Sequence, residues 1–517
     1  MFDLILKNGT LVNEGQIFES DIAIKGDRIE KIAPSIDAES KEIIDLQGKH
    51  VFPGLIDDQV HFREPGLTHK GNIQSESRAG LAGGVTSYFE MPNVNPTTTN
   101  RVNLQAKFDL AATKSHANYS FYMGASNSNI EEIKQLDHTL ACGLKVFMGA
   151  STGDMLVDNR DTLDAIFREA PVNIVTHCED TQMIQANEEA VIAEFGEEID
   201  ATFHPQIRSA AACLKSSQLA HDLATKHGSN LHILHLTTAD EMKLLTSGDL
   251  ASKKITGEVC VHHLYFSEAD YLTHGNQIKC NPSVKTEQDR LALIEAVKAN
   301  KIDIIATDHA PHTWEEKQQS YLKAPSGLPL IQHSLLVLLD FYAKDIFSLE
   351  QIVQKTSHNI AERFQIKDRG YLREGGFADL AIVDLSAETA VTKENILYHC
   401  GWSPFMGQTF PGSVEYTIIN GQVVYRDGVL SADLPIGQRM LFTRYCSFLI
   451  FFRCLCLMCI SDSMFVRLFI CVRVCCLLYL LTGLRPCLLA CLLACLLACL
   501  MACLLACLLA CLLACLL

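Results

Sequence analysis

Three histidines and one aspartate are the residues of this chain best suited to bind a metal ion. His61, His177 and His235 each lie at the end of an apolar run of strand length, and Asp308 ends another in "ATDHAPH". Imidazole nitrogens and carboxylate oxygens together suit zinc. A bound zinc ion lowers the pKa of its water to about 7, so hydroxide becomes available at neutral pH. The four residues therefore predict a metal-dependent hydrolase in which Asp308 also accepts a proton from that water.

Lys145 is an unexpected charge in the apolar run "GLKVFMGAS". An unpaired ammonium group inside such a run is costly to bury. One interpretation is a structural lysine that forms a salt bridge or reaches solvent along its aliphatic stem. The other is a lysine carboxylated by CO2, whose carbamate bridges two metal ions. Because Lys145 is predicted to meet the histidines at one site, we favour the carbamate.

Four further polar residues are candidates for substrate binding: Arg63, Asn93, Asn281 and His312. Arg63 follows His61 by two residues, so both side chains are expected to face the same way from an extended segment. The guanidinium fork of arginine suits a carboxylate. Asparagine also forms turns, so each amide alone is a weak signal. Around a metal-bound water, the four residues describe a pocket for a small anionic amide whose C–N bond is attacked.

The run "NLHILHLTT" holds two histidines three residues apart, His232 and His235. Side chains alternate between the two faces of a strand, so residues three apart point in opposite directions. His235 is therefore expected at the metal site, and His232 is expected to pack against surrounding helices.

These residues can meet only if the fold brings distant segments together. Strand-like and helix-like segments alternate through the middle of the chain, which is typical of a parallel α/β fold. The helix-like stretches cover residues 103–116, 161–170, 209–227 and 286–300. Eight apolar runs predict a (β/α)8 barrel, whose active site lies at the carboxyl ends of its strands. The runs cover residues 54–62, 84–93, 118–126, 143–151, 172–180, 230–238, 255–263 and 303–312.

The two ends of the globular part have the pattern of β structure. Alternating apolar and polar residues, broken by Asn-Gly and Gly-Asp, indicate hairpins in "DLILKNGTLV", "SDIAIKGDRIEKIA" and "VEYTIINGQVVYRDG". The predicted fold class is α/β, a TIM-like barrel with a small β-sandwich domain formed from both ends. The expected organisation is β-sandwich residues 1–52, barrel residues 53–370, β-sandwich residues 371–444 and a tail of residues 445–517.

Composition separates an acidic globular part from the tail. The formal net charge is −17, and the tail is net positive, so the first 444 residues carry all of the acidic excess. This balance argues against nucleic acid or an anionic membrane as a partner of the globular part. Its few scattered cysteines, with no signal peptide ahead of them, predict a reducing, cytoplasmic location and no disulfide framework.

The tail holds 15 of the 21 cysteines and ends in repeats of Leu-Ala-Cys-Leu. A repeated four-base DNA unit read in triplets encodes such a repeat, which favours translated simple-sequence DNA or read-through past a stop codon. A membrane anchor is the alternative, because an apolar run of about 20 residues can span a bilayer. The repeat has neither interfacial Trp or Tyr nor a flanking basic cluster, so we assign no function to it.

The motifs "PGLIDDQVHFREPG", "AGGVTSYFEMPN", "EVCVHHLYF" and "ATDHAPH" closely resemble those of the dihydroorotases, a group of the amidohydrolase superfamily. The resemblance runs from Phe2 to about Arg444. It implies reversible cyclisation of N-carbamoyl-L-aspartate to L-dihydroorotate in pyrimidine biosynthesis, with one or two zinc ions; we also expect a homo-oligomer such as a dimer. By this resemblance the metal-site residues are His61, Lys145, His177, His235 and Asp308, with Asp308 also the general acid and base, and the substrate-binding residues are Arg63, Asn93, Asn281 and His312.

The sequence also departs from the family's pattern. Gln59 stands where the family has the first histidine of a His-x-His pair. An amide oxygen is a weaker zinc ligand than imidazole, so an ion near His61 is expected to be loosely held or absent. The loops "NPSVK" and "APSGLPLIQH" differ from the usual ones as well.

Two alternatives to a dihydroorotase stay open. A related cyclic amidohydrolase, such as a dihydropyrimidinase (hydantoinase) or an allantoinase, shares the barrel and metals. Its substrate lacks the ring carboxylate that Arg63 would bind, which speaks against it. A non-catalytic dihydroorotase-like scaffold fits the presence of Gln59, but the five other metal-site residues are all retained.

Overall fold

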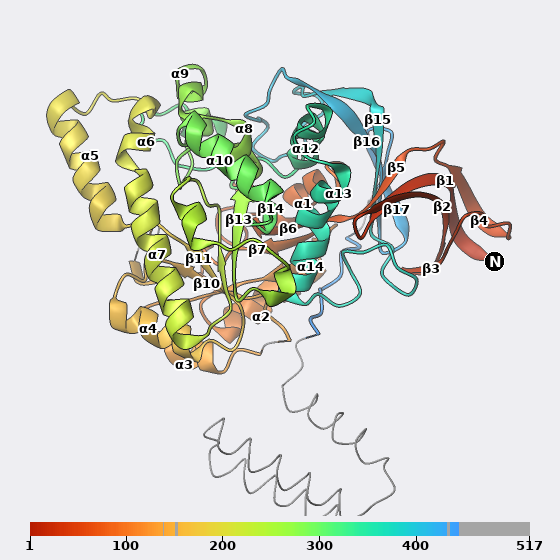
Figure 1. Ribbon diagram of the computed structural model, residues 1–517, viewed down its shortest axis with the longest axis horizontal. Coiled ribbons are helices and arrows are strands. Elements are labelled where there is room, and N and C mark those ends of the chain that lie inside the picture. Colours follow the sequence, from red (N-terminus) through yellow and green to blue (C-terminus); the bar gives the residue numbers. More distant parts are fainter. Residues whose placement is uncertain (138, 150–152, 432–434, 444–517) are drawn as a thin grey trace, which may run out of the picture. The chain divides into compact units, whose positions relative to one another are not determined.

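Parallel strands at the centre of the protein close into a barrel (Figure 1). The computed structural model describes residues 1–137, 139–149, 153–431 and 435–443, and the predicted tail lies outside them. The barrel strands are β6 (Leu55–Val60), β7 (Val85–Glu90), β8 (Asn118–Phe121), β9 (Met123–Gly124), β10 (Leu144–Phe147), β11 (Ile174–His177), β12 (Leu231–Ile233), β13 (Ile255–Cys260) and β14 (Ile304–Ala306).

Two hydrogen-bonded ladders make up the barrel, one of β6, β7 and β8 and one running from β9 to β14. Tyr122 N donates to Glu90 O at 3.1 Å where β8 continues into β9, and His61 N donates to His309 O at 2.7 Å between β6 and the segment after β14. These bonds join the ladders at both edges. Because β8 and β9 are two parts of one interrupted strand, the predicted eight-stranded barrel is confirmed.

Helices connect the strands, and the four predicted helical stretches are confirmed as α2 (Arg101–Ala112), α4 (Arg160–Glu169), α7 (Ala210–His227) and α10 (Glu287–Lys298). Each begins where a short polar side chain accepts a hydrogen bond from a backbone N–H of the first turn. These capping residues are Asn100, Asn159, Ser209 and Thr286. The other α-helices of the described residues are α1 (Ile73–Ala82), α3 (Ile130–Lys134), α5 (Thr181–Phe195), α6 (His204–Ile207), α8 (Val261–Tyr265), α9 (Tyr271–His274), α11 (Trp314–Lys317), α12 (Ser334–Ala343), α13 (Leu349–Val353) and α14 (Asn359–Phe364).

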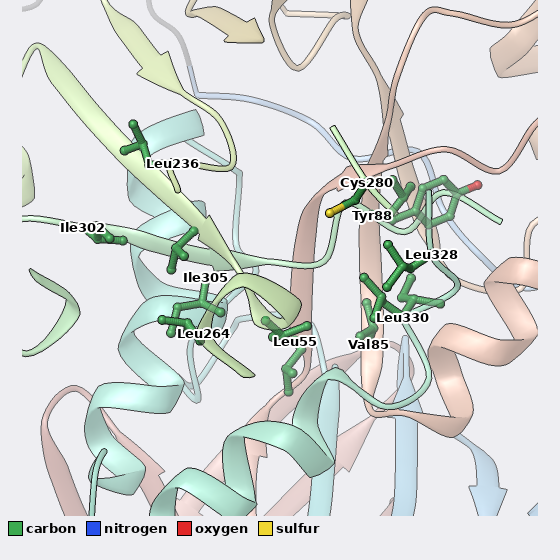
Figure 2. Close-up of a cluster of buried hydrophobic side chains, with 14 of the residues drawn as sticks. Leu55, Val85, Tyr88, Leu236, Leu264, Cys280, Ile302, Ile305, Leu328 and Leu330 are labelled. Carbon is green, nitrogen blue, oxygen red and sulfur yellow. The ribbon is translucent and has the colours of Figure 1, made fainter. Parts of the chain in front are cut away.

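An apolar layer between strands and helices holds the barrel together. Leu55 of β6, Val85 of β7 and Ile305 of β14 belong to one buried cluster with Leu264 of α8 (Figure 2). Burying a side chain of this size stabilises a fold by about 1.5–3 kcal/mol. The layer therefore fixes neighbouring strands firmly enough to position the side chains at their ends.

Strands from both ends of the described chain form one nine-stranded sheet. Its order is β18-β17-β16-β15-β5-β1-β2-β3, and β4 pairs with β1. β5 lies antiparallel to β15, with Leu380 opposite Pro53, and Leu6, Ile24 and Ile382 share one apolar cluster. The predicted small β domain built from both ends is therefore confirmed. Its strands are β1 (Phe2–Asn13), β2 (Gln16–Lys25), β3 (Arg28–Ala33), β4 (Ser40–Asp45), β5 (His50–Pro53), β15 (Leu380–Ala390), β16 (Thr409–Ile419), β17 (Gln422–Arg426) and β18 (Val429–Leu430).

Two smaller expectations concern membranes and disulfides. Within the described ranges, no helix is both long and apolar enough to cross a bilayer. The tail, for which a membrane anchor was the alternative, lies outside those ranges. No disulfide bond joins the cysteines of the described part, namely Cys142, Cys178, Cys213, Cys260, Cys280 and Cys400.

Three ionisable side chains lie fully buried inside the barrel, Asp58 of β6, His232 of β12 and Glu258 of β13. His232 Nε2 lies 3.4 Å from Asp58 Oδ2 and 3.5 Å from Glu258 Oε2. Although burial opposes protonation, the two carboxylates raise the pKa of His232 to about 9. Because β6 and β12 are not neighbouring strands, Asp58 and His232 can meet only across the barrel interior.

The His232 ring also packs edge-on against Phe364 of α14, with 5.9 Å between the ring centroids, so the predicted packing against a helix describes only part of its surroundings. The two-residue alternation holds only within a strand, and β12 ends at Ile233. His235 lies in the following turn with a φ of 37°, which lets its side chain face the interior as well.

The buried cluster generates a prediction about stability. Replacing His232 by leucine leaves two buried carboxylates without their cation and should lower the free energy of unfolding by about 3–5 kcal/mol. The double variant Asp58→Leu/His232→Leu should lose less than the sum of the two single losses, because the residues interact directly. Urea denaturation at neutral pH measures the free energy of unfolding of the native protein, the two single variants and the double variant. Additive losses would contradict the interaction.

Candidate metal centre

The ring nitrogens of two buried histidines face each other at the carboxyl ends of neighbouring strands. His177 is the last residue of β11, and His235 follows β12 by two residues. His177 Nδ1 lies 2.9 Å from His235 Nε2. Burial lowers the pKa of both imidazoles, so both are neutral at pH 7 and can offer a lone pair to a metal ion.

Glu179 fixes which nitrogen of His177 carries the proton. Its Oε2 lies 2.8 Å from His177 Nε2, and Arg208 bonds the same oxygen. Burial opposes ionisation, yet Arg208 and His177 hold the pKa of Glu179 at about 2. The carboxylate therefore accepts the His177 Nε2 proton and leaves the Nδ1 lone pair free. A carboxylate in this position orients a histidine ligand of zinc.

The backbone of His235 is held in place by Glu258, whose Oε1 accepts a hydrogen bond from His235 N at 3.1 Å. His235 Nδ1 is buried and has no hydrogen-bond partner among the described residues. Because Glu179 accepts the His177 proton, His177 Nδ1 can accept a hydrogen bond from His235 Nε2. With its proton on Nδ1 instead, His235 would offer a second nitrogen lone pair to a cation. The donor set is therefore suited to zinc.

Lys145 of β10 belongs to the same centre. Its side chain is buried, and Nζ lies 4.6 Å from the centroid of the Phe147 ring. Burial lowers the pKa of Lys145 to about 8, against the opposing attraction of Asp308. Its charge also lowers the pKa of His177 and of His235, so the three groups lie close together. A sizeable fraction of the Lys145 amine is neutral near pH 8.

Asp308 follows β14 and contacts two residues at the end of β6. Its Oδ1 lies 3.1 Å from His61 Nε2 and accepts a hydrogen bond of 3.0 Å from Gln59 Nε2. His61 Nδ1 in turn lies 2.9 Å from Asn93 Oδ1. Asp308 and Lys145 interact electrostatically. Asp308 thus lies between the His61 side of the centre and the Lys145 side.

Arg63 and His312 form a second group beside the centre. Arg63 Nη2 lies 3.0 Å from His312 Nε2, and Arg63 Nε donates to Pro311 O at 3.0 Å. Burial lowers the pKa of Arg63 to about 10, so the guanidinium stays charged at neutral pH. Lys70 Nζ lies 3.1 Å from His312 Nδ1. Glu316 lies 3.1 Å from Lys70 Nζ and 3.4 Å from His312 Nδ1, so Arg63 is the cation of this group that can bind a small anion.

Asn281 lies in the loop after α9, and its peptide bond to Pro282 is cis. Its Oδ1 is buried without a partner among the described residues. Asp308 raises the pKa of the neighbouring Cys280 thiol, after burial itself, which brings this loop near the centre. No hydrogen bond within the described ranges links Asn281 to Arg63 or His312, so the structure does not join it to that group.

Two other sets of buried residues place possible ligand atoms within 4.8 Å of one another. One is the cluster of Asp58, His232 and Glu258, in which His232 Nε2 lies 3.4 Å and 3.5 Å from the two carboxylates. The other is Cys260, His262 and His263. Burial raises the pKa of the Cys260 thiol well above its usual value, and zinc binds the thiolate. Neither set includes His177 or His235, so neither is the metal centre predicted from the sequence.

Sequence reasoning missed Glu179, Arg208 and Lys70. Glu179 stands two residues after His177 in "THCED", and this spacing is the signal that could have identified it. Arg208 and Lys70 lie in connecting segments outside the apolar runs, where a charged residue carries no distinct signal.

Comparison with known proteins agrees with this architecture. An allantoinase of Desulfitobacterium hafniense is 31% identical over 445 residues, 85% of this chain and 98% of that protein. A dihydroorotase of Fusobacterium nucleatum is 31% identical over 432 residues, 82% of this chain and 99% of that protein. An L-hydantoinase (dihydropyrimidinase) structure from Arthrobacter aurescens matches with a TM-score of 0.80 at 28% identity, covering 85% of this chain and all of that one.

These relatives carry different names at the same level of identity, so similarity alone does not select one of their activities. A family model places the chain more broadly. Residues 50–424 match the model described as the amidohydrolase family, a range that contains the whole barrel and all the candidate residues above. The chain belongs to the amidohydrolase family.

Proposed function

We propose that the protein is a zinc-dependent dihydroorotase, which interconverts N-carbamoyl-L-aspartate and L-dihydroorotate. The observation that carries the proposal is the buried Arg63 beside the metal centre, bonded to His312. The substrate's ring bears a carboxylate on the carbon that one methylene separates from the carbonyl of the cleaved amide. A charged guanidinium that is held in place beside the centre suits that carboxylate. Relatives named dihydroorotase at 31% identity support the assignment.

The residues assigned to the metal centre are His61, Lys145, His177, His235 and Asp308. A bound zinc ion supplies a water whose pKa is lowered to about 7. With such a water in place, Asp308 would be the residue that takes up a proton and gives it to the leaving amide nitrogen when the ring opens; ring closure would use the same residue in reverse. Its contacts with His61 and Gln59 both use Oδ1, which leaves Oδ2 for the proton.

Lys145 is assigned to the centre as a carbamate. Its neutral amine, present in quantity near pH 8, attacks the carbon of CO2 and releases one proton to solvent. The product, a carbamate, is an anion. It replaces the Lys145 ammonium group, which lacks a hydrogen-bond partner among the described residues. A carbamate would also add a carboxylate-like ligand beside His177 and His235.

Arg63, His312, Asn93 and Asn281 are assigned to the substrate. Arg63 binds the ring carboxylate. His312 contacts Arg63 Nη2 and binds the same carboxylate. Asn93 reaches the centre through His61. Asn281 offers a buried, unpaired Oδ1, which can accept a hydrogen bond from a ring N–H. We place the enzyme in the cytoplasm as a homo-oligomer, with a small molecule as its substrate.

The second candidate is hydrolysis of a neutral cyclic amide such as allantoin or hydantoin. The allantoinase relative, 31% identical, and the L-hydantoinase structure, with a TM-score of 0.80, favour it. Such a substrate leaves the Arg63 charge without an anionic partner, which is costly in a buried site. Dihydroorotate is therefore the better fit.

The role of Arg63 is tested by substitution. Arg63→Ala should lower kcat/KM for dihydroorotate about 100-fold or more, because the carboxylate loses a charged bidentate partner. Arg63→Lys should recover part of the loss, since a point charge replaces the fork. Zinc content should stay unchanged in both variants. Faster cleavage of allantoin or hydantoin than of dihydroorotate by the native protein would contradict the proposed function.

Carboxylation of Lys145 is tested without substrate. Native protein equilibrated with carbon-13 bicarbonate should show a carbamate carbonyl resonance by NMR, because the amine is partly neutral near pH 8. Lys145→Met keeps the length of the side chain and should lack the resonance. A native protein without the resonance, whose activity is insensitive to removal of CO2, would refute the carbamate.

A further inference from the structure

Gln59 takes part in the centre through its amide nitrogen. The side chain is buried at the end of β6, 1% exposed, and Nε2 donates to Asp308 Oδ1 at 3.0 Å. A carboxylate can only accept, so the N–H end of the amide must face Asp308. The oxygen end, Oε1, is buried and has no partner among the described residues.

The two sides of the centre are therefore unequal as metal sites. On one side, His177 Nδ1 and His235 Nε2 lie 2.9 Å apart with no carboxylate between them. On the other, His61 Nε2 lies 3.1 Å from Asp308 Oδ1, and that oxygen also accepts the Gln59 N–H. An ion shared by His61 and Asp308 would lie close to an amide N–H, whose partial charge is positive.

The ligand chemistry agrees with this asymmetry. Zinc in proteins is held by thiolate, imidazole and carboxylate groups, whereas a neutral carbonyl oxygen suits magnesium or calcium. Turning the amide so that Oε1 faced an ion would remove the hydrogen bond from Asp308. Both orientations of Gln59 thus disfavour zinc on the His61 side.

We propose that this chain has a one-ion centre, held on the side of His177 and His235, and that Gln59 is the residue that excludes a second ion. Gln59 acts as a positioning residue for Asp308. Its N–H holds Oδ1 of Asp308, whose backbone has a φ of 49°. Oδ2 of Asp308 stays available for proton transfer. His61 bonds Asp308 in this arrangement. The inference rests on the metal centre of the proposed function but not on the identity of the substrate.

The number of ions is tested by counting zinc in the purified full-length protein after dialysis against metal-free buffer. We expect about one zinc per chain in the native protein and about two in Gln59→His, because an imidazole completes the second site. Gln59→Glu supplies a carboxylate ligand at the same place and should also gain an ion. Gln59→Leu offers no ligand and should keep about one.

Replacing zinc by cobalt shows whether two ions are neighbours, and this readout does not depend on the protein concentration. One Co2+ ion should give an uncoupled paramagnetic resonance spectrum in the native protein, and a neighbouring pair should show spin coupling in Gln59→His. Two ions in the native protein, falling to one in Gln59→Leu, would overturn the proposal by making the amide a ligand. A single ion in the native protein and in both Gln59→His and Gln59→Glu would overturn the assignment to Gln59.

Positioning by Gln59 has its own readout. Gln59→Leu should lower kcat by about 10-fold or more with KM and zinc content unchanged, since it removes a bond to the proton-transferring group and leaves the substrate contacts intact. A rise in KM with constant kcat would contradict positioning. Failure of dihydroorotate turnover in a native protein with one zinc would remove the proposed function and leave the one-ion centre standing.

Discussion

The structure depends on one contact, the hydrogen bond between two buried imidazole rings inside the barrel. His177 Nδ1 and His235 Nε2 lie 2.9 Å apart, and burial keeps both rings neutral. Glu179 accepts a hydrogen bond from His177 Nε2, and Glu258 accepts one from the backbone N–H of His235. The His177 ring cannot turn away without losing its bond to Glu179. A cation can bind both facing nitrogens once the His235 proton moves to Nδ1, which has no partner among the described residues.

The rest of the barrel follows from placing groups around that pair. Lys145, Asp308 and His61 reach it from three other strands, and the barrel is the architecture that brings their carboxyl ends to one rim. The buried cluster of Asp58, His232 and Glu258 pairs one imidazole with two carboxylates, and Glu258 also bonds the backbone of His235.

The sequence allowed the barrel, its eight strands and its main helices to be predicted, because apolar runs and N-capping residues are local signals. It also placed His177, His235 and Asp308 at strand ends. Glu179 was missed because an acidic residue after a strand usually caps a helix or faces solvent. The carboxylate partners of His232 were not predicted because β12 ends at Ile233, and strand alternation says nothing about the turn that follows. Partnerships across the barrel are tertiary and carry no local pattern.

The most direct test of the account is the position of zinc in crystals of the protein, measured by anomalous diffraction at the zinc edge. The account predicts a peak about 2.0–2.1 Å from both His177 Nδ1 and His235 Nε2, with Lys145 and Asp308 adjacent. A zinc peak elsewhere, at Cys260, His262 and His263 for instance, with a hydrogen bond left between His177 and His235, would contradict it.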